Sequence, residues 1–222
     1  MKRYRDPRQL YQSVGFLYES HRDGQQGAPV IRVTELGRTV LRWLDLINEK
    51  NAPILGRHAA YALSACQLRN PVSRTARRFD QAVEVFPFAF IWRAMLCLEN
   101  RISSDELNRA LFRVRNESEL TEAIERIAEA RRTGQIEVMG EETITGPAKN
   151  DRIIPWMSMA SFGWILISDK RSADGDWYEI PQRMVPLIES AAQLKHRHRD
   201  FSSIAEYVEH ISSAAALPRD LR

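Results

Sequence analysis

The chain has 222 residues, of which 44% are hydrophobic, and its formal net charge is +3. This length holds one large domain or two small ones, and no apolar run approaches the roughly 18 residues that a membrane span requires. The basic residues at the start have no apolar run behind them, which argues against a secretory signal. Cys66 and Cys97 both lie in apolar helical patterns, so we expect two buried thiols and a cytoplasmic location. No spacing of cysteine or histidine indicates a zinc site.

The N-terminal region predicts a helix, a β-hairpin and a second helix. Pro7 is typical of a first helical residue, and Gly15 ends that helix. Residues 16–20 and Val30–Val33 flank a polar, glycine-rich break and predict the two strands of a hairpin. Thr34 precedes apolar residues at helical spacing, so we expect it to cap a long helix.

The middle of the chain predicts helices joined by turns. Apolar periodicity indicates helices at residues 56–68, 86–98 and 117–132. Ser103 or Ser104 is expected to cap a shorter helix that has acidic residues in its first turn. Residues 134–151 show no periodicity, so we expect a loop there, with a short strand at residues 136–138 as one option.

The order of elements predicted for the N-terminal region, a helix, a hairpin and a helix, occurs again from residue 155 onward. We expect a short helix at residues 155–162, strands at residues 164–167 and 177–180 around a turn-rich tip, and a helix that begins at Pro181. The motif Ser-Val-Gly-Phe before the first hairpin matches Ser-Phe-Gly-Trp before the second. Two copies of one unit indicate a structural repeat.

The C-terminal region begins with a basic run, residues 195–199, which we expect to be a solvated helix end or linker. An amphipathic helix follows at residues 202–213. Together the elements predict a mainly α fold with short β-hairpins, in which tandem winged-helix-like units are joined by helices. The expected domains are an incomplete first unit with connecting helices at residues 1–80, a second unit with a helical insertion at 81–195, and a basic linker with a C-terminal helix at 196–222.

In a winged helix, the helix before the hairpin usually lies in the major groove, where all four base pairs can be distinguished, and the hairpin contacts phosphates. The first unit offers polar side chains for these contacts: Arg8, Gln9, Gln12, Ser13 and Arg22. The corresponding helix of the second unit is apolar on most sides, so we expect Trp156, Met157 and Met159 to contact another domain or a partner protein. The phosphate contacts expected from the second unit are Lys149, Arg152, Lys170 and Arg171.

Arginine far outnumbers lysine in this chain. Arginine favours bidentate contact with phosphate or carboxylate, although an ordinary solvated surface explains the bias equally well. The densest basic cluster is Arg69, Arg74, Arg77 and Arg78. The last three share one side of an expected helix and predict a track for phosphates. The alternative is that they pair with acidic residues such as Asp80 and Glu84.

Catalysis is poorly supported. The sequence contains no glycine-rich phosphate loop, no Gly-x-Ser-x-Gly elbow and no His-Glu-x-x-His pair. The nearest acidic group, Asp174, Asp176 and Glu179, lies on the second hairpin without a partner lysine. We therefore expect no enzyme activity, no cofactor, no metal and no small-molecule substrate.

About half of the chain resembles a known family. The segment Phe86-Pro87-Phe88 with its apolar helix, the motif Ile102-Ser103-Ser104-Asp105-Glu106-Leu107, and a later Ala123-Ile124-Glu125-Arg126-Ile127 together resemble the recognition region of AlwI-type type IIS restriction endonucleases. The motif Val33-Thr34-Glu35-Leu36-Gly37-Arg38 also resembles a strand-to-helix step of that region and of MarR-like winged helices. The resemblance implies DNA recognition by winged helices. No segment matches the nuclease domain of that family, and one explanation is a split system in which a partner subunit supplies the catalytic domain or completes the fold.

Two functions follow from these patterns. The first is a non-catalytic subunit of a restriction or phage-defence assembly that binds double-stranded DNA together with a partner protein. The second is a tandem winged-helix adaptor that binds protein within an ATPase or nuclease complex. The polar first helix and the arginine cluster favour DNA, whereas the incomplete first unit and the apolar second helix favour protein. We expect DNA binding with an obligate partner and no membrane association.

Overall fold

The chain divides into two compact units, one of which is inserted into the other. The computed structural model describes residues 16–20, 30–34, 37–38, 41, 52–71, 81–145, 148–172, 175–194 and 196–214. Unit 1 comprises Met1–Gln81 and His196–Arg222, and unit 2 comprises Ala82–Lys195. The C-terminal segment, which the sequence sets apart as a linker and helix, therefore groups with the N-terminal region. Within the described ranges the fold is mainly helical, and no helix is long and apolar enough to cross a membrane.

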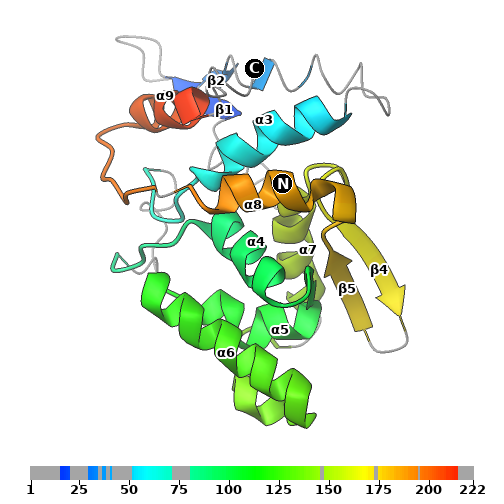
Figure 1. The fold of residues 1–222 in the computed structure, drawn as a ribbon. Coiled ribbons are helices and arrows are strands. Elements are labelled where there is room, and N and C mark those ends of the chain that lie inside the picture. Colours follow the sequence, from blue (N-terminus) through cyan, green and yellow to red (C-terminus); the bar gives the residue numbers. More distant parts are fainter. Residues whose placement is uncertain are drawn as a thin grey trace. The chain divides into compact units, whose positions relative to one another are not determined.

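Unit 1 contains a β-hairpin and two described helices (Figure 1). They are β1 (Leu17–Ser20), β2 (Val30–Val33), α3 (Ala52–Ser64) and α9 (Ile204–Ala214). The strands are antiparallel with Leu17 opposite Val33, which confirms the first predicted hairpin. Thr34 is also the cap that was expected, because its Oγ1 accepts a hydrogen bond from the Gly37 N–H at 2.9 Å. α3 packs against α9, which in turn contacts β1.

Unit 2 is built around α4 (Pro87–Cys97), an apolar helix that begins with proline and matches the predicted range closely. It packs against α6 (Glu117–Thr133), α7 (Ala148–Ser161) and α8 (Val185–Ala192). Trp92 of α4 is fully buried, and its indole N–H donates to the Ala160 carbonyl at 3.2 Å. This bond satisfies the one polar group of a large core side chain and fixes α4 on α7.

The sheet of unit 2 has three antiparallel strands in the order β3–β5–β4. They are β3 (Arg101–Ser103), β4 (Ser168–Ser172) and β5 (Gly175–Glu179). The second predicted hairpin is therefore present, but its first strand begins four residues later than expected. Phe162, Gly163 and Trp164 have φ angles of 42°, 64° and 68°, which an extended strand does not permit. The apolar residues 165–167 form a buried turn, and this burial accounts for their strand-like composition.

Local capping determines the helices around β3. Ser103 is the N-cap of α5 (Ser104–Arg109), and its Oγ accepts from the Glu106 N–H at 3.1 Å. Glu106 returns the bond by accepting from the Ser103 N–H at 2.7 Å, which completes a capping box. A short 3₁₀ turn, η3 (Leu111–Arg113), follows. α6 starts after Asn116, whose side chain caps it, and ends at Gly134 with a φ of 73°.

The segment between α6 and α7 differs from the prediction. Residues 136–138 do not form a strand but belong to a 3₁₀ turn, η4 (Ile136–Met139). The loop that follows is anchored to α5, because Asn108 donates to the Ile144 carbonyl at 3.0 Å and accepts from its N–H at 2.8 Å. α7 then starts at Ala148 rather than at Pro155, and the proline lies inside the helix. After the sheet, η5 (Gln182–Met184) precedes α8, where the sequence predicts one continuous helix from Pro181.

The two cysteines occupy opposite environments. Both are free thiols, and Cys66 is buried as expected, but Cys97 is exposed at the end of α4, so that part of the prediction is wrong. Burial raises the pKa of the Cys66 thiol well above its usual range, and its Sγ lies 3.6 Å from the Ala62 carbonyl oxygen. Since the thiolate is the reactive species, Cys66 should be inert in the folded chain.

Titration with Ellman's reagent should therefore reveal one fast thiol in the native chain and a second only after addition of guanidinium. The fast thiol should be Cys97 because its side chain reaches solvent. The variant Cys97→Ser should lose the fast phase, and Cys66→Ala should keep it. A fast phase that survives in Cys97→Ser would contradict the buried position of Cys66.

Candidate nucleic-acid interface

The two units carry opposite net charges. Unit 2 has 14 lysine and arginine residues against 18 aspartate and glutamate residues, a net charge of −4. The remaining residues, which form unit 1, have 18 basic against 11 acidic residues, a net charge of +7. The net charge of +3 on the whole chain is therefore the sum of a basic unit and an acidic unit. Polyanions such as DNA are attracted to the first and repelled by the second.

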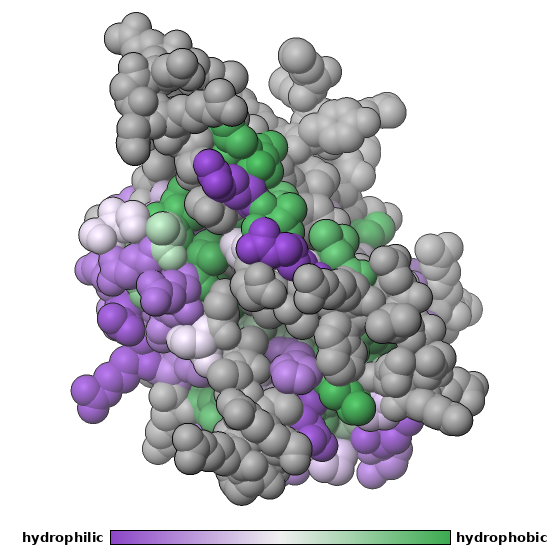
Figure 2. All heavy atoms as spheres, turned by 90° about the horizontal axis from the view of Figure 1, so that it is seen from above, coloured by the Kyte–Doolittle hydropathy of each residue, from purple (hydrophilic) through white to green (hydrophobic). Residues whose placement is uncertain are grey.

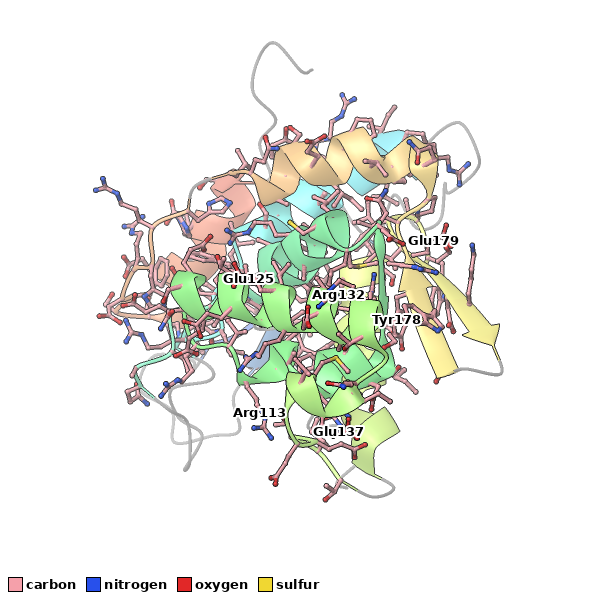
Figure 3. The ribbon with its side chains drawn as sticks, turned by 60° about the horizontal axis from the view of Figure 1, so that its bottom comes forward. Arg113, Glu125, Arg132, Glu137, Tyr178 and Glu179 are labelled. Atoms are coloured by element: carbon pink, nitrogen blue, oxygen red, sulfur yellow. The ribbon has the colours of Figure 1, made fainter. Side chains whose placement is uncertain are left out.

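Most described cations of unit 2 already have carboxylate partners. Arg93 forms a two-pronged pair with Glu117, and Arg109 contacts Asp105 at 2.9 Å and Glu142 at 3.3 Å. Further pairs join Arg101 to Glu99, Arg115 to Glu119, Arg131 to Glu106 and Arg132 to Glu129. Figure 3 shows α6 across the front of this unit, with Glu125 and Arg132 labelled on it. Side chains of both signs alternate here, and no continuous basic track forms on the described part of α6.

The hairpin of unit 2 offers less positive charge than the sequence predicts. The amine of Lys170 on β4 forms an ion pair with Glu179 on β5. This pair also corrects the expectation that the acidic residues of the hairpin lack a partner lysine. Arg171 lies on β4, and Lys149 and Arg152 lie on α7, but the side chains of these three are outside the described part of the structure.

The residues of α7 that were expected to contact a partner lie inside unit 2. Met157 is fully buried and Met159 is 9% exposed. Trp156 is half-buried, and its ring centroid lies 5.7 Å from that of Phe88 on α4. These side chains belong to the core, so the prediction of a partner contact is wrong for Met157 and Met159. The described residues that α7 exposes are instead Ile154, Pro155 and Ser158, none of which is charged.

Several residues of unit 1 were predicted to contact DNA. Among them, Arg69 is the one whose side chain lies in the described part of the structure. Its guanidinium donates to the Gln81 carbonyl and to Nδ1 of His198, the latter at 3.0 Å, and lies 3.7 Å from the Asp200 carboxylate. The side chain is 17% exposed. These contacts place Arg69 inside unit 1, where its N-terminal and C-terminal segments meet, rather than at an open phosphate site.

Residues 196–199 of the basic run are likewise not a free linker. Nε2 of His196 lies 3.0 Å from Ser64 Oγ, and the backbone of Arg199 is hydrogen-bonded to the Gln67 side chain. Gln67 and Tyr207 were not singled out by the sequence, although both are buried and each contacts the other part of unit 1. The remaining predicted contacts lie outside the described residues: Arg8, Gln9, Gln12, Ser13, Arg22, Arg74, Arg77 and Arg78.

Unit 1 exposes apolar side chains as well as basic ones. Val30 and Ile31 of β2 are 40% and 49% exposed, and Ile54 of α3 is 47% exposed. Figure 2 shows hydrophobic atoms at the surface beside hydrophilic ones on the face it views. Exposed apolar side chains of this kind are typical of surfaces that contact another molecule. No family model matches this chain, and no curated protein sequence matches it significantly.

Proposed function

We propose that this chain is a non-catalytic subunit that binds double-stranded DNA through its basic unit 1, within an assembly that includes a partner protein. The observation that carries the proposal is the separation of charge, +7 on unit 1 against −4 on unit 2. Non-specific affinity for duplex DNA comes from neutralising phosphates, so binding is expected where the positive charge is concentrated. The arginine cluster at positions 74, 77 and 78 belongs to this unit.

The topology of unit 2 supports a winged-helix relationship. Its elements run α4, β3, α5, α7, β4 and β5, and β3 pairs with β5 to give a sheet in which the hairpin follows a helix. Winged helices share this order. The departure is α6, which lies between the two helices that a short turn normally joins. This order and pairing support a winged-helix shape for unit 2, but shape alone does not establish a ligand.

A second function, protein binding by unit 2, is favoured by the surface of α7. In a winged helix this helix would enter the major groove, yet from Ile153 to Ser168 the chain has no charged residue. Ile154 is 49% exposed and Trp164 is 52% exposed. Among the exposed side chains of this stretch, only the Trp164 indole N–H and the Ser158 hydroxyl could form hydrogen bonds with base edges. We therefore assign DNA to unit 1 and protein contact to unit 2.

Binding of a labelled duplex to the purified chain, measured by fluorescence anisotropy between about 50 and 200 mM salt, tests the proposal. We expect affinity to fall steeply with salt, in proportion to the number of phosphates contacted. A plasmid incubated with the chain and magnesium should stay intact. Absence of duplex binding at low salt would overturn the DNA function, and cleavage would overturn the non-catalytic one.

A further inference from the structure

A surface segment of unit 2 is held against α5 and η3 by bonds to its backbone. Residues 140–144, which we call the strap, leave η4 at Gly140, whose φ of 93° turns the chain. Asn108 of α5 donates from Nδ2 to the Ile144 carbonyl at 3.0 Å and accepts at Oδ1 from the Ile144 N–H at 2.8 Å. The Asn108 carbonyl also accepts from the Thr143 N–H at 3.3 Å. Asn108 thus pairs with the strap backbone much as a neighbouring strand would.

Two arginines, Arg109 of α5 and Arg113 of η3, hold the rest of the strap. Arg109 donates to the Gly140 carbonyl at 3.1 Å, and its Nη2 lies 3.3 Å from Oε1 of Glu142. Arg113 donates to the Glu141 carbonyl at 2.7 Å and to the hydroxyl of the strap threonine at 3.0 Å. Arg113 is labelled below α6 in Figure 3. We call the three residues that hold the strap the cradle: Asn108, Arg109 and Arg113.

The strap lies at the surface, whereas the helix that carries the cradle is fixed from the core side. No residue of the strap is buried. Leu107 is fully buried and Leu111 is 5% exposed, so α5 and η3 are packed independently of the strap. Asn108 is also fully buried, and its side-chain bonds to Ile144 are lost when the strap leaves. That loss favours any other segment that offers the same backbone groups.

We propose that the cradle is a recognition site for an acidic peptide segment of a partner protein, and that the strap is the resident occupant which such a segment displaces. The strap defines the ligand: a backbone N–H and C=O of one residue for Asn108, and a carboxylate two positions earlier for Arg109. The net charge of −4 on unit 2 opposes the approach of an acidic peptide, so recognition depends on these short-range bonds. The proposal does not depend on DNA binding.

The strap competes strongly with a free peptide because it is part of the same chain. A short tether gives an effective concentration on the order of mM, so a peptide at μM concentration does not displace the strap. A cradle that is open about a tenth of the time has an apparent affinity about tenfold weaker than the open cradle. Weakening the strap should therefore raise the affinity of the full chain for a free peptide at least about tenfold.

Fluorescence anisotropy of a labelled peptide with the sequence of residues 140–145, capped at both ends, tests the proposal. The variant Glu142→Lys with Ile144→Pro repels Arg109 and removes the N–H that Asn108 accepts, so it releases the strap and keeps the cradle. It should bind the peptide at least about tenfold more tightly than the parent. Adding Arg113→Ala should weaken that binding about fivefold or more. Adding Arg132→Ala instead, at a 72% exposed site on α6, should change it by less than about twofold.

Several results would overturn the proposal. Parent-like affinity in the released variant would do so, and so would equal binding of a scrambled peptide of the same composition, which would show that only charge is recognised. Displacement of the peptide by duplex DNA would assign the cradle to phosphates instead. Should the released variant fail to fold, hydrogen exchange of the Ile144 amide in the parent decides the question. Peptide at about 10 mM should raise that rate about twofold or more, and an unchanged rate would exclude displacement of the strap.

Discussion

Replacing Arg74, Arg77 and Arg78 together with alanine should weaken binding to every duplex DNA sequence and flatten its salt dependence. The three residues recur at helical spacing and belong to the unit with a net charge of +7. Each lost phosphate contact should lower the slope of log affinity against log salt by about 0.9, so that the loss of all three removes about 2.7. Anisotropy titrations with two unrelated duplexes at several salt concentrations measure this slope directly.

A matched control exists in unit 2. Arg126, Arg132 and Arg183 are exposed, and their combined replacement by alanine removes the same formal charge. We expect this variant to bind DNA with the slope of the parent, because the acidic unit is not the one in contact. Equal weakening by both triple variants would show that only total charge matters. Parent-like DNA binding by the unit 1 variant, combined with loss of a partner protein, would favour the adaptor function.

The helices whose signals are local could be predicted from the sequence. α4, α6 and α9 lie within two residues of their expected ranges, because each combines apolar periodicity with a cap or a proline at its start. The sequence placed the cap of α5 at Ser103 or Ser104, and the structure shows it at Ser103, where a capping box is complete within four residues. Both hairpins were also indicated, because strand composition and turn residues are short-range signals.

The errors occur where a local signal has two explanations. Pro155 was interpreted as a helix start, yet Ile153, Met157 and Ala160 form one buried face that continues through it. Packing of that face offsets the hydrogen bond that the proline removes. The apolar run at residues 164–167 has the composition of a strand, but the left-handed residues before it turn the chain. β3 has only three residues, too few for a period of two to emerge.

The candidate site depends on contacts that a single sequence does not reveal. The Gln67 side chain pairs with the backbone of a residue 132 positions away, and nothing in the composition of either segment indicates that they meet. Arg69 shows the consequence. A basic cluster in the sequence suggested a phosphate contact, but the fold supplies a histidine, a carbonyl and a carboxylate for this guanidinium. The charge separation between the units, by contrast, follows from the sequence once the boundaries at residues 82 and 195 are known.

The ion pair of Glu106 and Arg131 should be the most sensitive polar contact of unit 2. Glu106 is 5% exposed and Arg131 is 19% exposed, and Nε of Arg131 donates to the carboxylate at 2.7 Å. Arg131 also donates to the Leu98 and Arg101 carbonyls at 2.7 and 2.8 Å, and its guanidinium lies 5.4 Å from the Trp177 ring centroid. One side chain thus joins α6, the end of α4, β3 and β5.

Arg131→Ala should therefore lower the free energy of unfolding by about 3–5 kcal/mol, because it leaves the Glu106 carboxylate buried without its guanidinium partner and removes one donor from each of the Leu98 and Arg101 carbonyls. Denaturant titration followed by tryptophan fluorescence measures the change. The neighbouring Arg132, 72% exposed and paired with Glu129, is the control, and Arg132→Ala should stay within about 0.5 kcal/mol of the parent. Figure 3 labels this residue on α6.

The double variant Glu106→Gln with Arg131→Ala separates charge from packing. Glutamine retains an oxygen that can accept from the Ser103 N–H, so the capping box survives while the buried charge is removed. We expect this variant to be more stable than Arg131→Ala alone, because an uncompensated buried charge costs more than a neutral amide in the same place. Arg131→Lys should fall between the parent and Arg131→Ala, since an ammonium keeps the charge but cannot reproduce the planar fork that reaches Glu106 and both carbonyls. Equal stability of the double variant and Arg131→Ala would show that Arg131 acts by bridging the carbonyls and Trp177, and that neutralising Glu106 contributes little.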